Sequence, residues 1–291
     1  MDLQAHVKSL IPEAELTRRG FVVTSLATGF ALVARPVSAE AVTTDMRGLV
    51  AGEVKIPVKD GQIPAYRAMP EAGGPFPVTL VVHEAFGVHE YLKDVCRRLA
   101  KLGHMGIAPE LFARQGDASK YTLAEAQKLM ADIVSKVPDE QVLSDLDAAA
   151  AWAGTTGKAN MAKLSITGFC WGGRIVWLYA ARNPRLKAAV AWYGPLEGAT
   201  SPLKPKNPVD IANDVKAPVL GLYGGKDQGI TQAAVAKMRA ALKAAKKNAE
   251  IVVYPEAGHA FHADYRASYN ADAAREGWNR MVGWLAAHGA G

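Results

Sequence analysis

The sequence predicts an α/β fold, in which a mostly parallel central sheet is covered by helices on both faces. Short apolar runs typical of buried strands alternate with longer segments that have the apolar spacing of helices. Crossover connections of this kind place parallel strands side by side and helices over both faces of the sheet. The chain has 291 residues and is 49% hydrophobic, so it can bury a large core.

The chain from residue 52 onward predicts the elements of this sheet. Two short strands, Gly52–Val58 and Ala65–Met69, flank the turn Lys59–Gly61 and form an antiparallel start. The buried strands expected after them are Pro77–Val82, Met105–Ala108, Lys163–Thr167, Ala188–Trp192, Pro218–Tyr223 and Glu250–Tyr254. The expected helices are His89–Leu102, Thr122–Val134, Asp139–Ala153, Arg174–Ala181, Thr231–Lys246 and Asp272–Ala287. The proline-rich and charged segment Leu196–Asp214 predicts an excursion over the surface.

The N-terminal segment resembles a twin-arginine export signal. Arg18 and Arg19 precede an apolar run that continues to Ala34, and a small-x-small exit ends at Ala39. The run is too short to span a bilayer comfortably, so we expect no permanent membrane anchor. We expect a signal peptide at residues 1–39, a single catalytic domain at 50–288 and a periplasmic location. The alternative is a retained amphipathic helix on a cytoplasmic protein.

Charge and composition argue against two other classes of partner. The net charge is +6, but the densest cationic group, Arg239, Lys243, Lys246 and Lys247, has the spacing of one solvated helix face. The sequence has no basic stripe interleaved with aromatic residues, so we expect no nucleic-acid partner. Its seven histidines and two cysteines show no metal-ligand spacing, so we expect no metal.

The stretch Gly168–Gly173 predicts a nucleophile elbow around Cys170. It joins a buried strand to a helix, and small residues flank the cysteine on both sides. A turn this tight forces its central residue into a strained conformation, which only glycine-like neighbours accommodate. The thiol then stands clear of the backbone, with a helix N-terminus pointing at the reaction centre. Cys96 lies in a helical pattern and is predicted to be a small buried apolar residue.

Polar residues after other strand ends are the candidate partners of this thiol. Glu84, Asp227 and His259 each follow a predicted strand, and ligands bind beyond the carboxyl ends of such strands. The chain order Cys170, Asp227, His259 is that of nucleophile, acid and base in hydrolases with a nucleophile elbow. A thiol needs such a base because the thiolate is the nucleophile, and the acid fixes the tautomer of the histidine.

Each candidate also has a structural alternative. Glu84 could cap the following helix, and Asp227 could stabilise its own turn. His262 is the local rival of His259. We expect His83 and His104 to be structural, satisfied by the backbone or bordering the pocket.

Five stretches resemble the dienelactone hydrolase family of the α/β-hydrolase fold. They are His83–Gly87, Ala108–Arg114, Gly168–Gly173, Gly224–Asp227 and Ala257–Phe261. The resemblance implies a hydrolase without a cofactor that opens a lactone such as 4-carboxymethylenebut-2-en-4-olide. The reaction passes through a cysteine acyl-enzyme formed by a Cys-Asp-His triad.

The resemblance also implies roles for single residues. Glu84 holds the resting thiol and takes its proton when substrate binds, and we expect partial burial to raise the pKa of this carboxylate. The backbone N–H groups of Ala85 and Trp171 form the oxyanion hole. Arg114 matches the family arginine that pairs with an anionic substrate, the alternative being a surface salt bridge. A second family arginine after the histidine is not matched, and the nearest arginine is Arg266.

Two other functions stay open at this point. The unmatched arginine leaves room for a broad-specificity carboxylesterase that acts on another ester. A non-catalytic exported binding protein on the same scaffold is the second alternative, although such a protein has no need of all four polar candidates. We expect a monomer or small oligomer that binds a small lactone or ester.

Overall fold

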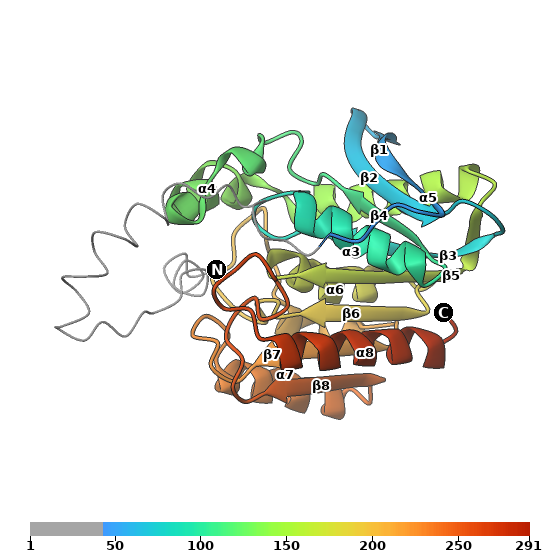
Figure 1. Ribbon diagram of the computed structural model, residues 1–291. Helices are drawn as coiled ribbons and strands as arrows, with labels where there is room; N and C mark the ends of the chain where they lie inside the picture. The colour runs from blue at the N-terminus through green and yellow to red at the C-terminus, as the bar shows by residue number, and fades with distance from the viewer. Residues whose placement is uncertain (1–42) are drawn as a thin grey trace, which may run out of the picture.

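One eight-stranded sheet organises residues 43–291, the part of the chain that the computed structural model describes. The strand order is β1-β2-β4-β3-β5-β6-β7-β8 (Figure 1). The strands are β1 (Leu49–Val58), β2 (Gly61–Pro70), β3 (Phe76–Val82), β4 (Met105–Pro109), β5 (Ala159–Phe169), β6 (Ala188–Trp192), β7 (Val219–Gly224) and β8 (Ala249–Tyr254). The main helices are α3 (Glu90–Lys101), α4 (Ala126–Asp132), α5 (Asp139–Thr155), α6 (Trp171–Arg182), α7 (Gln232–Ala244) and α8 (Ala271–Ala287). The predicted signal peptide lies outside the described residues.

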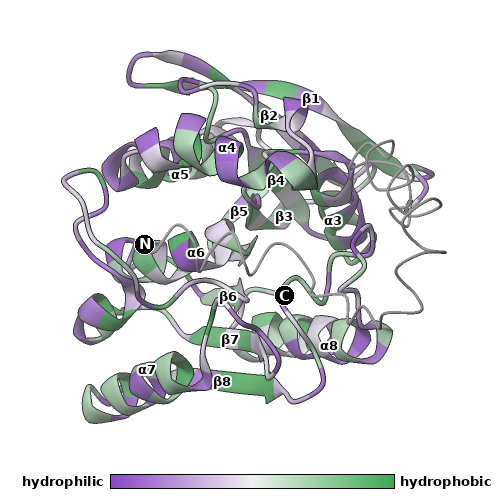
Figure 2. Ribbon diagram, turned by 90° about the vertical axis from the view of Figure 1, so that its left-hand side faces the viewer, coloured by the Kyte–Doolittle hydropathy of each residue, from purple (hydrophilic) through white to green (hydrophobic). Residues whose placement is uncertain are grey.

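The strand pairing confirms the predicted α/β architecture. β1 and β2 form an antiparallel hairpin, and β2 also pairs antiparallel with β4. All pairs from β4 across to β8 are parallel. Helices α3 and α8 cover one face of the sheet, and α5, α6 and α7 cover the other (Figure 2). Because both faces are covered, β6 and β7 are buried along their whole length, which explains their continuously apolar sequences.

Two segments differ from the sequence-based expectation. The helix expected at Thr122–Val134 is α4 between two short 3₁₀ turns, Leu123–Glu125 and Val134–Lys136. A capping box between Thr122 and Glu125 begins this region, and Ile133 ends α4 with a non-helical φ of −120° while its side chain stays buried. The capping box and the non-helical backbone of Ile133 therefore divide the expected helix into three short segments.

The excursion at Leu196–Asp214 is anchored to the body rather than lying wholly on the surface. Lys204 is buried, and its ammonium group donates a 2.6 Å hydrogen bond to the carbonyl oxygen of Val134. The segment then ends in a 3₁₀ turn, Pro208–Asp214. Among residues 43–291, no helix combines the length and the apolar character needed to cross a membrane.

The glycines of the elbow allow β3, β5 and α6 to pack backbone against backbone. A Cβ atom on Gly172 would lie 2.4 Å from the carbonyl oxygen of Val82 and 2.6 Å from that of His83. We therefore expect Gly172→Ala to lower the free energy of unfolding by about 3 kcal/mol, measured by urea denaturation. Gly283→Ala on α8 is the matched control, since nothing lies within 4 Å of its added methyl group. Equal stability of the two variants would contradict this packing.

Candidate active site

Cys170 lies at the turn between β5 and α6, as the elbow motif predicts. Its backbone adopts a φ of 53° and a ψ of −119°, a conformation that is strained for a residue with a side chain. The turn is held by its N–H group, which donates a 3.0 Å hydrogen bond to the carbonyl oxygen of Trp192 on β6. The residue is fully buried, and α6 begins at the next position. The helix N-terminus therefore stabilises negative charge on the thiol.

Asp227 and His259 follow the neighbouring strands β7 and β8 and form a hydrogen-bonded pair. His259 Nδ1 donates to Asp227 Oδ2 at 2.7 Å. The other carboxylate oxygen accepts hydrogen bonds from the N–H groups of Gly229 and Ile230, at 2.9 and 3.0 Å. These bonds fix the position of Asp227, and its hydrogen bond to His259 orients the imidazole ring. The side chain of His259 also interacts with Cys170.

Cys170 acts directly on the ionisation of His259. Burial lowers the pKa of this histidine, but the Asp227 carboxylate and the charge and hydrogen bond of Cys170 raise it to about 10. These neighbours therefore favour the protonated form of the imidazole ring. A protonated imidazole beside a sulfur atom favours the thiolate form of that sulfur, which is the nucleophilic form. The arrangement is suited to a thiolate–imidazolium pair.

Glu84 follows β3 and is fully buried in a cluster of three polar side chains. Its Oε2 accepts a hydrogen bond from the Tyr265 hydroxyl group. The same oxygen lies 3.6 Å from both His89 Nε2 and Arg266 Nη2. Burial raises the pKa of this carboxylate, but Arg266, His89 and Tyr265 outweigh burial and hold the pKa at about 2. The expectation of a raised pKa at Glu84 is therefore wrong, because the carboxylate is buried together with a cation.

Comparison with known proteins places the chain in a family. The model of the dienelactone hydrolase family matches residues 63–289. The chain belongs to this family. It is therefore an enzyme, a hydrolase of carboxylic esters, and it has the α/β-hydrolase fold.

Individual relatives are similar over nearly their full length. A protein of Methylorubrum extorquens named "Putative carboxymethylenebutenolidase" is 63% identical over 286 residues, 98% of each chain. One of the same name from Escherichia coli K12 is 53% identical over 92% of this chain and 98% of its own. The crystal structure of a "Putative Dienelactone Hydrolase" from Klebsiella pneumoniae superposes with a TM-score of 0.80 at 58% identity, covering 82% of this chain and 98% of the other.

Arg266 lies in the same buried cluster as Glu84, although counting residues from His259 did not match it to the second family arginine. Its side chain is buried, its guanidinium lies 5.5 Å from the Phe86 ring centroid, and its Nε donates to the Tyr265 hydroxyl oxygen at 3.1 Å. Two successive turns connect it to the histidine, with N–H groups of Ala263 and Arg266 bonded to carbonyls three residues earlier. These turns bring Arg266 back toward Glu84, and spacing along the chain does not reveal them.

Arg114, the expected substrate clamp, is paired with carboxylates of the chain itself in this structure. Its Nε and Nη2 donate to the two carboxylate oxygens of Asp60, in the β1–β2 turn, and its Nη1 donates to Asp145 of α5 at 2.7 Å. Both edges of the guanidinium are thus occupied by carboxylates of the chain itself. Arg114 therefore forms the salt bridges expected under the structural alternative, and these ion pairs connect the β1–β2 hairpin to α5.

Three other histidines, His83, His262 and His104, are held in structural contacts. His83 Nε2 accepts the N–H of Leu111 at 3.1 Å, and its Nδ1 lies 2.6 Å from the carbonyl oxygen of Glu84. His262 Nδ1 is hydrogen bonded to the Tyr91 hydroxyl at 2.6 Å, and burial lowers the pKa of His262 to about 3. His104 is paired with Thr79 in the core. None of these three contacts involves the Asp227 carboxylate, so His262 is not a rival base.

The backbone beside the thiol offers two further donors. Within residues 43–291, the N–H groups of Ala85 and Trp171 donate to no protein acceptor. The two donors belong to the loop after β3 and to the first turn of α6, which the glycines of the elbow bring together. The same described residues contain no group of three or more His, Cys, Asp or Glu side chains placed to hold a metal ion.

Proposed function

We propose that Cys170, Asp227 and His259 form the catalytic triad of a lactone hydrolase that works through a thiol acyl-enzyme. The observation that supports this proposal is the 2.7 Å pair of His259 and Asp227 beside a cysteine at a strained strand-to-helix turn. The thiolate attacks the lactone carbonyl, the ring C–O bond breaks, and His259 protonates the leaving oxygen. His259 then takes a proton from water, which attacks the thioester and releases the acid.

The N–H groups of Ala85 and Trp171 form the oxyanion hole in this mechanism. Neither group donates to another acceptor in the described part of the chain, so both are available where negative charge develops on the substrate oxygen. Such preorganised donors need no rearrangement during the reaction. Because they belong to the backbone, the two side chains need not take part.

Arg266 binds the carboxylate of an anionic substrate, and Glu84 activates the thiol in this mechanism. The guanidinium of Arg266 is the cation buried within the site, and its Nη2 has no hydrogen-bond partner among the described residues. A substrate carboxylate that pairs with Arg266 weakens the hold of the arginine on Glu84. The pKa of Glu84 then rises from about 2, and the carboxylate accepts the thiol proton when a neutral thiol is present.

The names of the relatives support a dienelactone as the substrate. A direct test is to assay the wild-type enzyme on cis- and trans-4-carboxymethylenebut-2-en-4-olide and on p-nitrophenyl acetate. We expect a kcat/KM for a dienelactone at least about 100-fold above that for the neutral ester. A ratio near one would favour a broad carboxylesterase, and turnover of neither substrate would contradict the assignment of a dienelactone as the substrate.

We expect Asp227→Asn to slow the alkylation of Cys170 by iodoacetamide at pH 7 by about tenfold. The carboxylate raises the pKa of His259 to about 10, so its loss lowers that pKa and reduces the thiolate fraction. The rate is measured by mass spectrometry between pH 5 and pH 10. In the wild type it should be nearly independent of pH around neutrality, and in the variant it should rise with pH.

Cys96 provides the internal control for this alkylation experiment. Burial raises the pKa of its thiol well above the ordinary value, so we expect no modification at this position in the folded protein. Identical pH profiles for the wild type and Asp227→Asn would show that Asp227 does not control the ionisation of the pair.

A further inference from the structure

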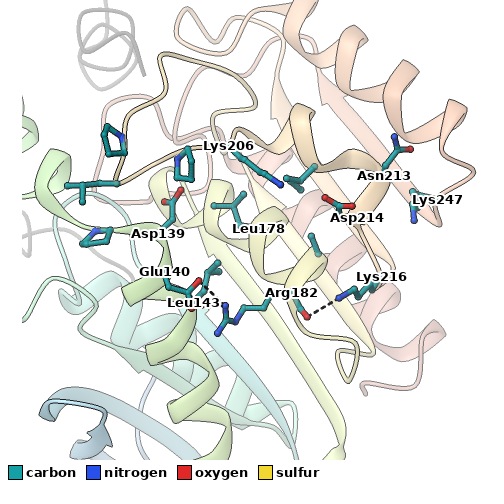
Figure 3. A pocket seen from close by; sticks show the side chains of 16 residues that line it. Asp139, Glu140, Leu143, Leu178, Arg182, Lys206, Asn213, Asp214, Lys216 and Lys247 are labelled. Carbon is teal, nitrogen blue, oxygen red and sulfur yellow. Dashed lines mark hydrogen bonds and ion pairs between the residues drawn. The ribbon is translucent and has the colours of Figure 1, made fainter.

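A pocket of about 720 Å³ lies away from the catalytic cysteine, between α5, α6 and the excursion Leu196–Asp214 (Figure 3). Helix α6 connects the two sites, since it begins next to Cys170 and presents Leu178 and Arg182 to the pocket. At 1.5 Å per residue, Leu178 lies about 12 Å along the helix from the cysteine. The pocket has the volume typical of a small-molecule site, and neither Cys170, His259 nor Glu84 lines it.

The inner wall of this pocket is apolar. Leu178 and Ile211 are almost fully buried at its base, and Leu143 and Ala181 complete the wall on the helix side. Leu203 lies on the excursion and is 40% exposed at the edge. A ligand with an apolar body gains binding free energy when it displaces water from this wall.

The rim of the pocket has an excess of positive charge. Two of its acidic residues are already neutralised, because Asp139 pairs with Arg174 at 2.7 Å and Glu140 with Arg182 at 2.9 Å. The remaining charged groups are Lys206, Lys216, Lys247 and Asp214. Within residues 43–291, no ion pair engages any of these four side chains, although Lys216 also donates to the carbonyl oxygen of Arg182 at 3.3 Å. The rim therefore carries three lysines and one aspartate outside these ion pairs, and Asp214 lies between Lys206 and Lys247 (Figure 3).

We propose that this pocket binds a small amphiphile with one anionic head, of which a medium-chain carboxylate is the simplest case. Its apolar body lies on Leu178 and Ile211, and its carboxylate lies among the ammonium groups of Lys206, Lys216 and Lys247. The charge complementarity selects an anion over a neutral or cationic amphiphile. The concave shape and modest volume suit a small molecule rather than a folded partner. This site is separate from hydrolysis and does not depend on the triad.

The test is isothermal titration calorimetry of the full chain with octanoate, octanol and octylammonium. We expect octanoate to bind about tenfold more tightly than octanol, and octylammonium to show no binding. The variant Lys206→Glu/Lys216→Glu/Lys247→Glu should bind octanoate at least about tenfold more weakly. The exposed Lys243→Glu on α7 is the charge control, since it does not line the pocket. Equal affinity for octanoate and octanol, or an unaffected triple variant, would overturn the proposal.

Two further measurements separate this pocket from the catalytic site and from a protein interface. Enzyme alkylated at Cys170 should bind octanoate unchanged, whereas loss of binding would place the anion in the catalytic site and overturn the proposal. Because Leu203 is partly exposed, we expect Leu203→Glu to fold normally. This variant places a charge in the apolar wall and should weaken octanoate binding about tenfold. A wild-type dimer that the triple variant converts to a monomer, seen by light scattering, would instead identify the face as a contact between copies and overturn the proposal.

Discussion

Cys170→Ala should reduce kcat/KM for both dienelactone and p-nitrophenyl acetate by at least about 10⁴-fold. Without the sulfur atom no covalent acyl-enzyme forms, and the His259–Asp227 pair has no nucleophile to activate. The replacement keeps a Cβ atom at the same strained φ of 53° and removes only one buried atom. We therefore expect the protein to fold, with a thermal midpoint within a few degrees of the wild type.

Mass spectrometry separates a covalent role of Cys170 from a structural one. Rapid quenching of the wild type with p-nitrophenyl acetate should trap an acetyl group on Cys170, and the alanine variant should trap none. Cys96→Ala is the matched cysteine control and should keep normal turnover if its thiol only fills space in the core. Retention of more than about a tenth of the activity by Cys170→Ala would contradict the thiol mechanism.

Arg266→Leu should raise KM for a dienelactone by about 100-fold and affect p-nitrophenyl acetate much less, because only the lactone bears a carboxylate for the guanidinium. It should also lower the free energy of unfolding by about 3 kcal/mol at pH 7. The variant leaves Glu84 buried without its cation, at a position where the wild-type carboxylate has no exposed surface. Steady-state kinetics and urea denaturation measure the two effects.

The stability effect of Arg266→Leu depends on pH with a defined sign. In the wild type the pKa of Glu84 is held at about 2, below the ordinary value of 4.5. This depressed pKa contributes stability above pH 4.5, and the contribution is lost as the pH falls toward 2. The variant lacks the cation that depresses the pKa. The stability difference between wild type and variant should therefore be largest at neutral pH and shrink in acid.

Two further variants serve as controls for Arg266. In the double variant Glu84→Gln/Arg266→Leu we expect recovery of part of the lost stability, because no buried charge is left unpaired. Arg114→Leu removes an arginine that pairs with Asp60 and Asp145 and should leave the KM for dienelactone unchanged. A larger increase in KM for Arg114→Leu than for Arg266→Leu would instead identify Arg114 as the residue that binds the substrate carboxylate.

Local signals in the sequence were enough to predict the architecture of the sheet and the nucleophile elbow at Cys170. The apolar runs that became β3, β6 and β7 are nearly continuous because both faces of the sheet are covered, so these runs predict buried strands directly. The glycines around Cys170 form a short motif that is recognisable in the sequence. Their structural role is to leave room for backbone carbonyl oxygens at the ends of neighbouring strands, which a Cβ atom at Gly172 or Gly173 would meet. Asp227 and His259 were predictable because each follows a strand end at the same edge of the sheet.

Contacts between distant segments were decided only by the tertiary structure. Arg266 reaches Glu84 across 182 positions of the sequence because two turns after His259 fold the chain back, and this contact makes Glu84 a stronger acid than burial alone predicts. Arg114 lies in a matching sequence motif, yet Asp60 and Asp145 engage it from other elements. Motifs and periodicity determine where strands end and which residues follow them. The charge on a buried side chain depends on its neighbours in space, which the order of residues does not specify.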